Sequence, residues 1–118
     1  MSRTVVLIVE DEFLLRLHAA TLIGEAGFET VEAGSADEAM QVLESRGDIG
    51  IVFTDVDLPG RMDGLDLCAA IRDRWPPVEL VVTSGHVQVE DEDLPERGFF
   101  LPKPYDPAQL VQTLQSLA

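Results

Sequence analysis

The chain has 118 residues, the length of one domain, and 46% of them are hydrophobic, too many for a disordered chain. Its 22 acidic and 8 basic residues give a net charge of −14, which argues against direct contact with the phosphate backbone of nucleic acids. No apolar run approaches the length of a membrane span, and the run over 5–9 is too short for the core of a signal peptide. With one cysteine, Cys68, which fits a reducing compartment, the chain is expected to be cytoplasmic and to bind neither nucleic acid nor a membrane.

Strand and helix patterns alternate along the chain. In order, they predict a strand over 4–9, a helix over 13–26, a strand over 29–33, a helix over 35–45, a strand over 49–54, a helix over 64–75, strands over 78–83 and 99–101, and a helix from 107 onward. In the first helix one face carries Leu14, Leu17, Thr21 and Leu22. Ser35 and Glu38 have the spacing of a capping box, and Asp106 precedes a proline at the start of the last helix.

This alternation predicts an α/β fold in which five parallel strands form one sheet with helices on both faces, the flavodoxin-like (βα)5 arrangement, as a single domain over 1–118. The segment between Gly85 and Gly98 departs from the pattern. Four consecutive acidic residues, 90–93, are followed closely by Pro95, which disfavours a long helix. A short or irregular fourth helix is therefore expected there.

Polar residues stand at the ends of four predicted strands. Glu10 and Asp11 follow the first strand and Asp55 and Asp57 follow the third, while Thr83 ends the fourth. Lys103, the only lysine in the chain, follows the fifth. The carboxyl ends of parallel strands share one edge, where ligands of such folds bind. Carboxylates suit Mg²⁺, a lysine suits a phosphoryl oxygen, and an aspartate can form an acyl phosphate.

The sequence resembles the receiver domains of bacterial response regulators over nearly its whole length. The resemblance rests on VLIVEDE at 6–12, IVFTDVDLPG at 51–60, MDGLDL at 62–67, VVTSGH at 81–86 and FLPKPY at 100–105. Two features depart from the common pattern: the turn from Asp55 to Gly64 has one extra residue, and the fourth helix is in doubt. The chain looks like a stand-alone member with no output domain.

The resemblance implies a role for each residue at the strand ends. By this resemblance Asp55 accepts the phosphoryl group, and Thr83 and Lys103 contact that group. The ligands implied for Mg²⁺ are Glu10, Asp11, Asp55 and the backbone carbonyl of Asp57. Thr83 and Phe100 match the family's switch residues. The bond between Lys103 and Pro104 is cis in many members.

The function implied is a phosphorylation-dependent switch of a two-component system. The phosphodonor is a histidine kinase or a phosphotransfer protein, the downstream partner is a protein that the sequence does not name, and the chain catalyses only its own phosphorylation and dephosphorylation. Two alternatives stay open. One is a haloacid-dehalogenase-like phosphatase, which also has an Asp-x-Asp motif such as Asp55–Asp57, although its metal-binding acids follow the lysine. The other is a pseudo-receiver scaffold that is never phosphorylated.

Overall fold

The computed structural model describes residues 3–85, 89–90, 92, 94 and 97–118. Its elements are β1 (Val5–Val9), α1 (Phe13–Glu25), β2 (Glu29–Ala33), α2 (Ala36–Ser45), β3 (Ile49–Asp55), α3 (Gly64–Arg74), β4 (Glu79–Ser84), β5 (Gly98–Pro102) and α4 (Pro107–Leu117). These bounds agree within one residue with the strands and helices expected from the pattern.

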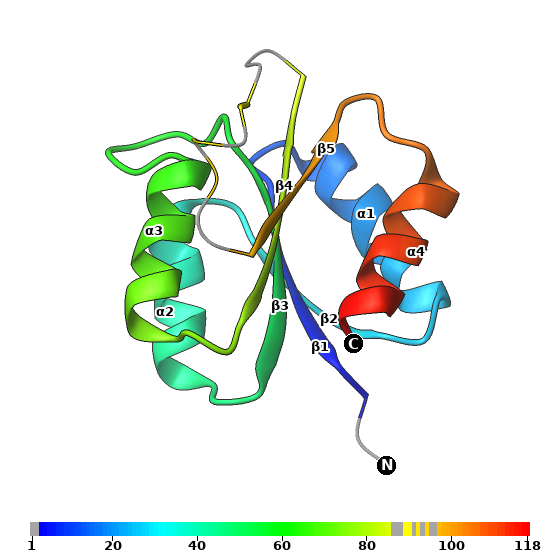
Figure 1. Ribbon diagram of the computed structural model, residues 1–118, viewed down its shortest axis with the longest axis horizontal. Coiled ribbons are helices and arrows are strands. Elements are labelled where there is room, and N and C mark those ends of the chain that lie inside the picture. The colour runs from blue at the N-terminus through cyan, green and yellow to red at the C-terminus, as the bar shows by residue number, and fades with distance from the viewer. Residues whose placement is uncertain (1–2, 86–88, 91, 93, 95–96) are drawn as a thin grey trace.

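The five strands form one parallel sheet in the order β2-β1-β3-β4-β5. Helices α2 and α3 cover one face and α1 and α4 the other (Figure 1). This confirms the expected flavodoxin-like α/β fold. Successive crossovers change direction between β1 and β3, so the carboxyl ends of these two central strands flank the crevice in which such folds bind ligands.

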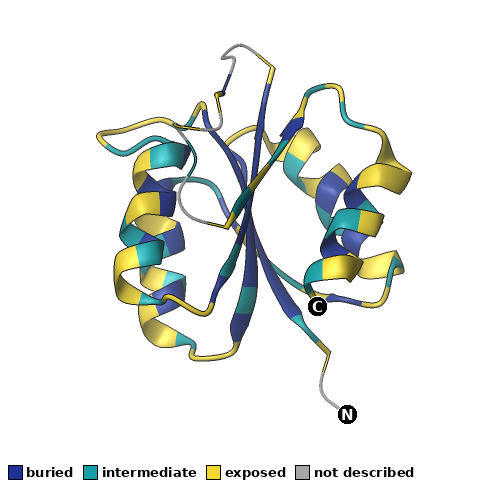
Figure 2. Ribbon diagram, viewed as in Figure 1, coloured by how far each residue is buried: buried dark blue, intermediate teal, exposed yellow. Residues whose placement is uncertain are grey.

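The core consists of two layers, one on each face of the sheet (Figure 2). Side chains alternate along β1, so Leu7 packs with α2 and α3 while Ile8 packs with α1 and α4. The three central strands, β1, β3 and β4, are buried over nearly their whole length, which explains why they read as apolar runs, whereas the edge strands β2 and β5 are partly exposed.

Helix α1 departs from the expected packing. The residues that it buries are Ala19 and Ile23. The face with Leu14 and Leu17 points to solvent instead, where these side chains are 68% and 45% exposed. The apolar pattern continues around most of this helix, so the leucine spacing did not distinguish the face that meets the sheet.

The helix starts follow the cap residues. Ser35 accepts the Glu38 amide at 3.2 Å, although Glu38 in turn accepts the amide of Gly34 rather than that of Ser35. Asp106 accepts the amide of Ala108 at 2.8 Å, as its place before Pro107 predicts. A full capping box that the sequence reading missed joins Asp63 and Asp66 at the start of α3.

The expected short fourth helix between β4 and β5 falls mostly on residues outside the described part of the chain, namely 86–88, 91, 93 and 95–96. The described residues of this segment contain no α-helix, and Glu92 has 3₁₀ geometry. Val89 is buried and joins the core layer under α2 and α3. Within the described ranges no helix has both the length and the apolar character that crossing a membrane requires.

Candidate functional site

The strand ends converge as the sequence predicts. Asp55 at the end of β3 pairs in register with Thr83 on β4, and Lys103 directly follows β5. Two further contacts fix this edge: the amide of Val56 donates to the Thr83 carbonyl at 2.9 Å, and the amide of Lys103 donates to the Ser84 carbonyl at 3.0 Å. The sheet backbone therefore sets the positions of the polar side chains.

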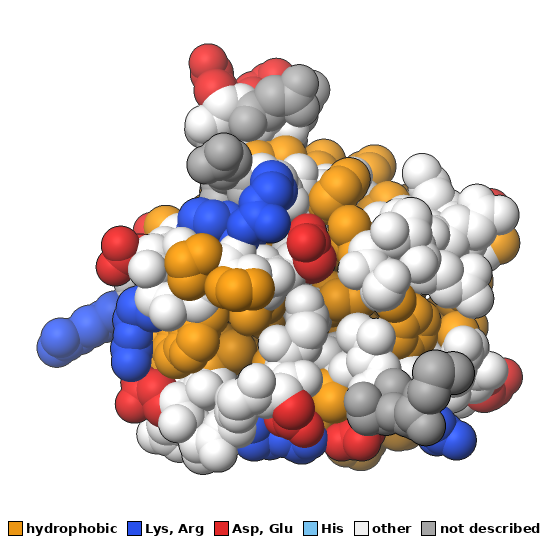
Figure 3. All heavy atoms as spheres, turned by 60° about the horizontal axis from the view of Figure 1, so that its bottom comes forward, with side chains coloured by type: hydrophobic (Ala, Val, Ile, Leu, Met, Phe, Trp, Pro, Cys, Tyr) orange, Lys and Arg blue, Asp and Glu red, His pale blue; other side chains and the backbone are white. Residues whose placement is uncertain are grey.

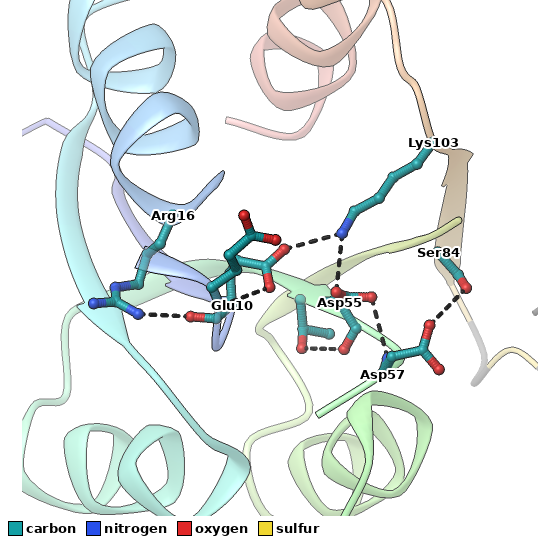
Figure 4. Close-up of polar contacts among 8 residues, drawn as sticks. Glu10, Arg16, Asp55, Asp57, Ser84 and Lys103 are labelled. Carbon is teal, nitrogen blue, oxygen red and sulfur yellow. Dashed lines mark hydrogen bonds and ion pairs between the residues drawn. The ribbon is translucent and has the colours of Figure 1, made fainter. Parts of the chain in front are cut away.

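Lys103 links two carboxylates. Its Nζ lies 2.9 Å from Asp55 Oδ2 and 3.0 Å from Glu10 Oε1 (Figure 4). Partial burial favours the neutral amine, but the hydrogen bonds and charges of Asp55 and Glu10 outweigh it and raise the pKa of Lys103. The ammonium is thus held charged between two acids whose side chains are 7% and 9% exposed.

Three carboxylates gather at this edge. Glu10, Asp11 and Asp55 each offer an oxygen within 4.8 Å of the others. Burial raises the pKa of Glu10, the charge of Asp55 adds to this effect, and hydrogen bonds from Lys103 and the Glu12 amide counteract it. Clustered hard oxygen atoms with unfavourable mutual repulsion form the donor set that a divalent cation such as Mg²⁺ prefers.

The Asp57 side chain points away from this cluster. Its Oδ2 accepts a hydrogen bond from Ser84 Oγ at 3.4 Å, and its backbone amide donates to Asp55 Oδ1 at 3.1 Å. The carboxylate is exposed and is not one of the three clustered groups. Its expected role as a ligand through the backbone carbonyl stays a prediction.

Thr83 carries a buried hydroxyl that is unsatisfied. The residue is 3% exposed, and its Oγ1 has no hydrogen-bond partner among the described residues. A buried hydroxyl without a partner is unfavourable, which favours a ligand oxygen at this point. Phe100, the other expected switch residue, lies on β5 opposite Val82, partly buried against the core layer of α2 and α3.

Two backbone features shape the edge. The bond between Lys103 and Pro104 is cis, as the resemblance implied. Gly64, the first residue of α3, packs so closely under β3 that a Cβ atom there would lie 2.0 Å from the Asp55 carbonyl oxygen. Only glycine allows this approach, which places the start of α3 directly behind Asp55.

A cavity of about 440 Å³ opens beside the site. Asp55, Thr83 and Lys103 form part of its wall. The remainder is mainly apolar and comes from α1, β3 and the loop after β5, with Leu15, Ala19, Phe53 and Tyr105. The sequence reading missed this cavity, because no local pattern links α1 to the residues after Lys103.

Cys68 lies apart from the site. It is fully buried in the core layer of α2 and α3, and burial raises the pKa of its thiol to about 12. Cys68 is therefore an unreactive core residue.

The fold and the polar edge together define a signalling module built on a parallel α/β sheet. The chain belongs to the response regulator receiver domain family, whose model matches residues 6–115. A response regulator receiver protein from Pseudomonas putida has 30% identity, a TM-score of 0.88 and coverage of 98% of both chains. A receiver protein from Sinorhizobium medicae has 27% identity and a TM-score of 0.91, over 98% of this chain and 94% of that one.

Curated relatives are longer proteins. The sensor kinase CckA of Brucella abortus is 33% identical over 95% of this chain but only 12% of its own length. The transcriptional regulatory protein PdtaR of Mycobacterium tuberculosis is 32% identical over 93% of this chain and 54% of its own length. The similarity therefore covers the receiver part of these proteins. Membership of this family excludes the alternative of a haloacid-dehalogenase-like phosphatase.

Proposed function

We propose that the chain is a phosphorylation-dependent switch of a two-component system in which Asp55 accepts a phosphoryl group. The observation that carries this proposal is the environment of its carboxylate. Asp55 contacts the Lys103 ammonium, clusters with the carboxylates of Glu10 and Asp11, and pairs in register with Thr83, whose buried hydroxyl has no hydrogen-bond partner among the described residues. A cationic side chain, carboxylates that can hold a divalent metal and a hydroxyl donor are groups that together stabilise a transferring phosphoryl group.

The reaction is a transfer between donor and carboxylate. An oxygen of Asp55 attacks the phosphorus atom, a P–O bond forms to give an acyl phosphate, and the bond from phosphorus to the donor's leaving atom breaks. With a phosphohistidine donor, the imidazole nitrogen keeps the electron pair and takes up a proton. Hydrolysis of the acyl phosphate later returns the carboxylate and inorganic phosphate, so the chain catalyses only its own modification and its reversal.

The neighbouring residues hold the phosphoryl oxygens. Lys103 Nζ already lies 2.9 Å from Asp55 and donates to one phosphoryl oxygen. Thr83 donates its hydroxyl to another, which satisfies the buried group. This contact biases the positions of Thr83 and Phe100 and passes the signal to a downstream protein.

The residues that would hold Mg²⁺ are Glu10, Asp11 and Asp55 through their carboxylates and Asp57 through its backbone carbonyl. The three clustered carboxylates fit a hard cation. When bound, Mg²⁺ neutralises charge on the carboxylates and the phosphoryl oxygens.

The exposed apolar surface of α1 supports a protein as the phosphodonor. Phe13, Leu14, Leu15 and Leu17 are 41–68% exposed, and Leu15 borders the cavity that contains Asp55. A histidine kinase or phosphotransfer protein that packs an apolar helix on α1 would bring its phosphohistidine to the cavity.

Phosphorylation of wild type, Asp55→Asn and Asp73→Asn with acetyl phosphate and Mg²⁺ tests the proposal. Intact-mass spectrometry should detect one phosphoryl adduct on wild type and on Asp73→Asn, whose residue 73 is exposed on α3, and none on Asp55→Asn. An adduct of equal yield on Asp55→Asn would exclude Asp55 as the acceptor. A wild type without any adduct would favour the pseudo-receiver alternative.

A further inference from the structure

Arg16 on α1 reaches back to the acidic end of β1. Its Nη1 donates to the backbone carbonyl of Glu10 at 2.8 Å, and its Nε donates to Glu32 Oε1 on β2 at 3.2 Å (Figure 4 shows the first contact). The guanidinium also lies 5.6 Å from the centre of the Phe13 ring. The side chain is 19% exposed, so this is a well-packed arginine rather than a mobile surface charge.

The carbonyl that Arg16 binds belongs to the peptide unit joining Glu10 to Asp11. The preceding amide, that of Glu10, donates to the Ala33 carbonyl at 3.1 Å as the last contact between β1 and β2. Beyond that contact the backbone leaves the sheet. The Glu10–Asp11 peptide, which joins the two acidic residues, is therefore no longer held by hydrogen bonds to β2. Arg16 fixes its orientation instead, through the Glu10 carbonyl.

We propose that Arg16 is a positioning residue of the metal site, which holds the Glu10–Asp11 peptide so that both carboxylates point toward Asp55. This inference rests on the proposed function, because it assigns Arg16 to the Mg²⁺ site of that same reaction. Arg16 does not touch the cation or the phosphoryl group. It acts through Glu10 and Asp11, with Glu32 as its anchor on β2.

The positioning role of Arg16 and its positive charge predict opposite changes in Mg²⁺ affinity when Arg16 is removed. Arg16 carries a positive charge next to a site for a cation, so by electrostatics alone its removal should tighten Mg²⁺ binding. If Arg16 positions the ligands, its removal should weaken binding, because groups that orient metal ligands typically contribute about 10–100-fold in affinity. The sign of the change in Mg²⁺ Kd thus separates the two roles.

The experiment measures Mg²⁺ binding by calorimetry without any phosphodonor, in wild type, Arg16→Met, Arg16→Lys and Arg46→Met. Arg46 is the matched control, since it also bonds two acidic residues, Glu29 and Asp48, but at the opposite end of the sheet. We expect the Kd to rise about tenfold or more in Arg16→Met and to stay unchanged in Arg46→Met. Arg16→Lys keeps the charge but has one donor atom for two acceptors, so its Kd should rise by less.

An Arg16→Met protein that binds Mg²⁺ as tightly as wild type, or more tightly, overturns the inference. If that variant does not fold, Arg16→Lys decides, and a Kd equal to that of wild type then overturns it. Failure of wild type to bind Mg²⁺ is a failure of the proposed function instead. In that case amide exchange of Glu12, which donates to Glu10 Oε2 at 3.2 Å, tests Arg16 separately: exchange no faster in Arg16→Met than in wild type overturns the positioning role.

Discussion

Lys103 neutralises two acids that are otherwise poorly compensated. Glu10 and Asp55 are both buried, and each accepts a hydrogen bond from the same ammonium. A phosphoryl group on Asp55 would compete with these carboxylates for Lys103. The lysine stabilises the two carboxylates, and in the proposed function it would stabilise the phosphoryl oxygens during transfer.

Lys103→Ala should fold but accept the phosphoryl group slowly, on the order of 10²-fold below wild type, since one charged donor to the transferring group is lost. Lys103→Arg should recover only part of the rate, because the planar guanidinium is bulkier and directs its donors differently. Time courses with acetyl phosphate, followed by intact mass, measure both rates. Mg²⁺ binding is the control and should be at least as tight in Lys103→Ala, where a competing cation has been removed. Unchanged rates in both variants would show that Lys103 has no part in transfer.

Helix α1 contacts both the core of the sheet and the functional site. Its inner face packs Ala19 and Ile23 on the sheet, Arg16 holds the β1 end, and its outer face exposes leucines. This division gives the helix two separable roles, one in the site and one at the surface.

Leu14→Asp should slow transfer from a phosphorylated histidine kinase or phosphotransfer protein about tenfold or more, since it places an unpaired charge in the apolar contact that the donor would bury. Transfer from acetyl phosphate should not change, because Leu14 is 68% exposed and does not line the cavity. Phe99→Asp is the control, as Phe99 is also an exposed apolar residue but lies on β5. Equal slowing with both donors would mean that the substitution damages the site rather than the docking surface.

The elements and the converging side chains could be predicted because both follow from local patterns. Apolar runs indicate buried strands, and parallel strands place Asp55, Thr83 and Lys103 at one edge. The orientation of α1 could not be predicted, because a helix that is apolar on most sides lacks a clear periodicity. The contact of Arg16 with Glu10 and the close approach of Gly64 to Asp55 could not be predicted either, because each depends on backbone distances between elements.

Across the whole molecule the two ends of the sheet differ in charge balance. At the amino ends of the strands, acidic and basic side chains are interspersed (Figure 3), and Arg46 pairs with Glu29 and Asp48. The carboxyl end holds three clustered carboxylates with Lys103 as the cation that contacts two of them. Repulsion among these carboxylates, which Lys103 offsets only in part, lowers the stability of the folded state at this end.

Mg²⁺ should therefore stabilise the folded protein. At ten times Kd the gain is about 1.4 kcal/mol, which corresponds to a rise of roughly 5 °C in Tm for a domain of this size. Asp11→Asn should remove most of this gain, because it deletes a clustered carboxylate. Asp57→Asn should keep most of it, since the Asp57 side chain bonds Ser84 outside the cluster.

Melting curves in EDTA and in Mg²⁺ measure these shifts. A wild type with the same Tm in both at near-saturating Mg²⁺ would show that the acidic cluster is not a metal site. Equal losses in Asp11→Asn and Asp57→Asn would place the Asp57 side chain among the ligands.

The position of the single lysine also gives the site one chemical reporter. Lys103 has the only side-chain amine in the sequence, and its Nζ lies within 3.0 Å of two site carboxylates. Within this sequence Lys103 is therefore the one side-chain target for an amine-directed reagent, and it reacts slowly while the two carboxylates hold it charged. A change in the rate of acylation at Lys103, read from a single peptide, then reports a change in what contacts this amine at that edge of the sheet.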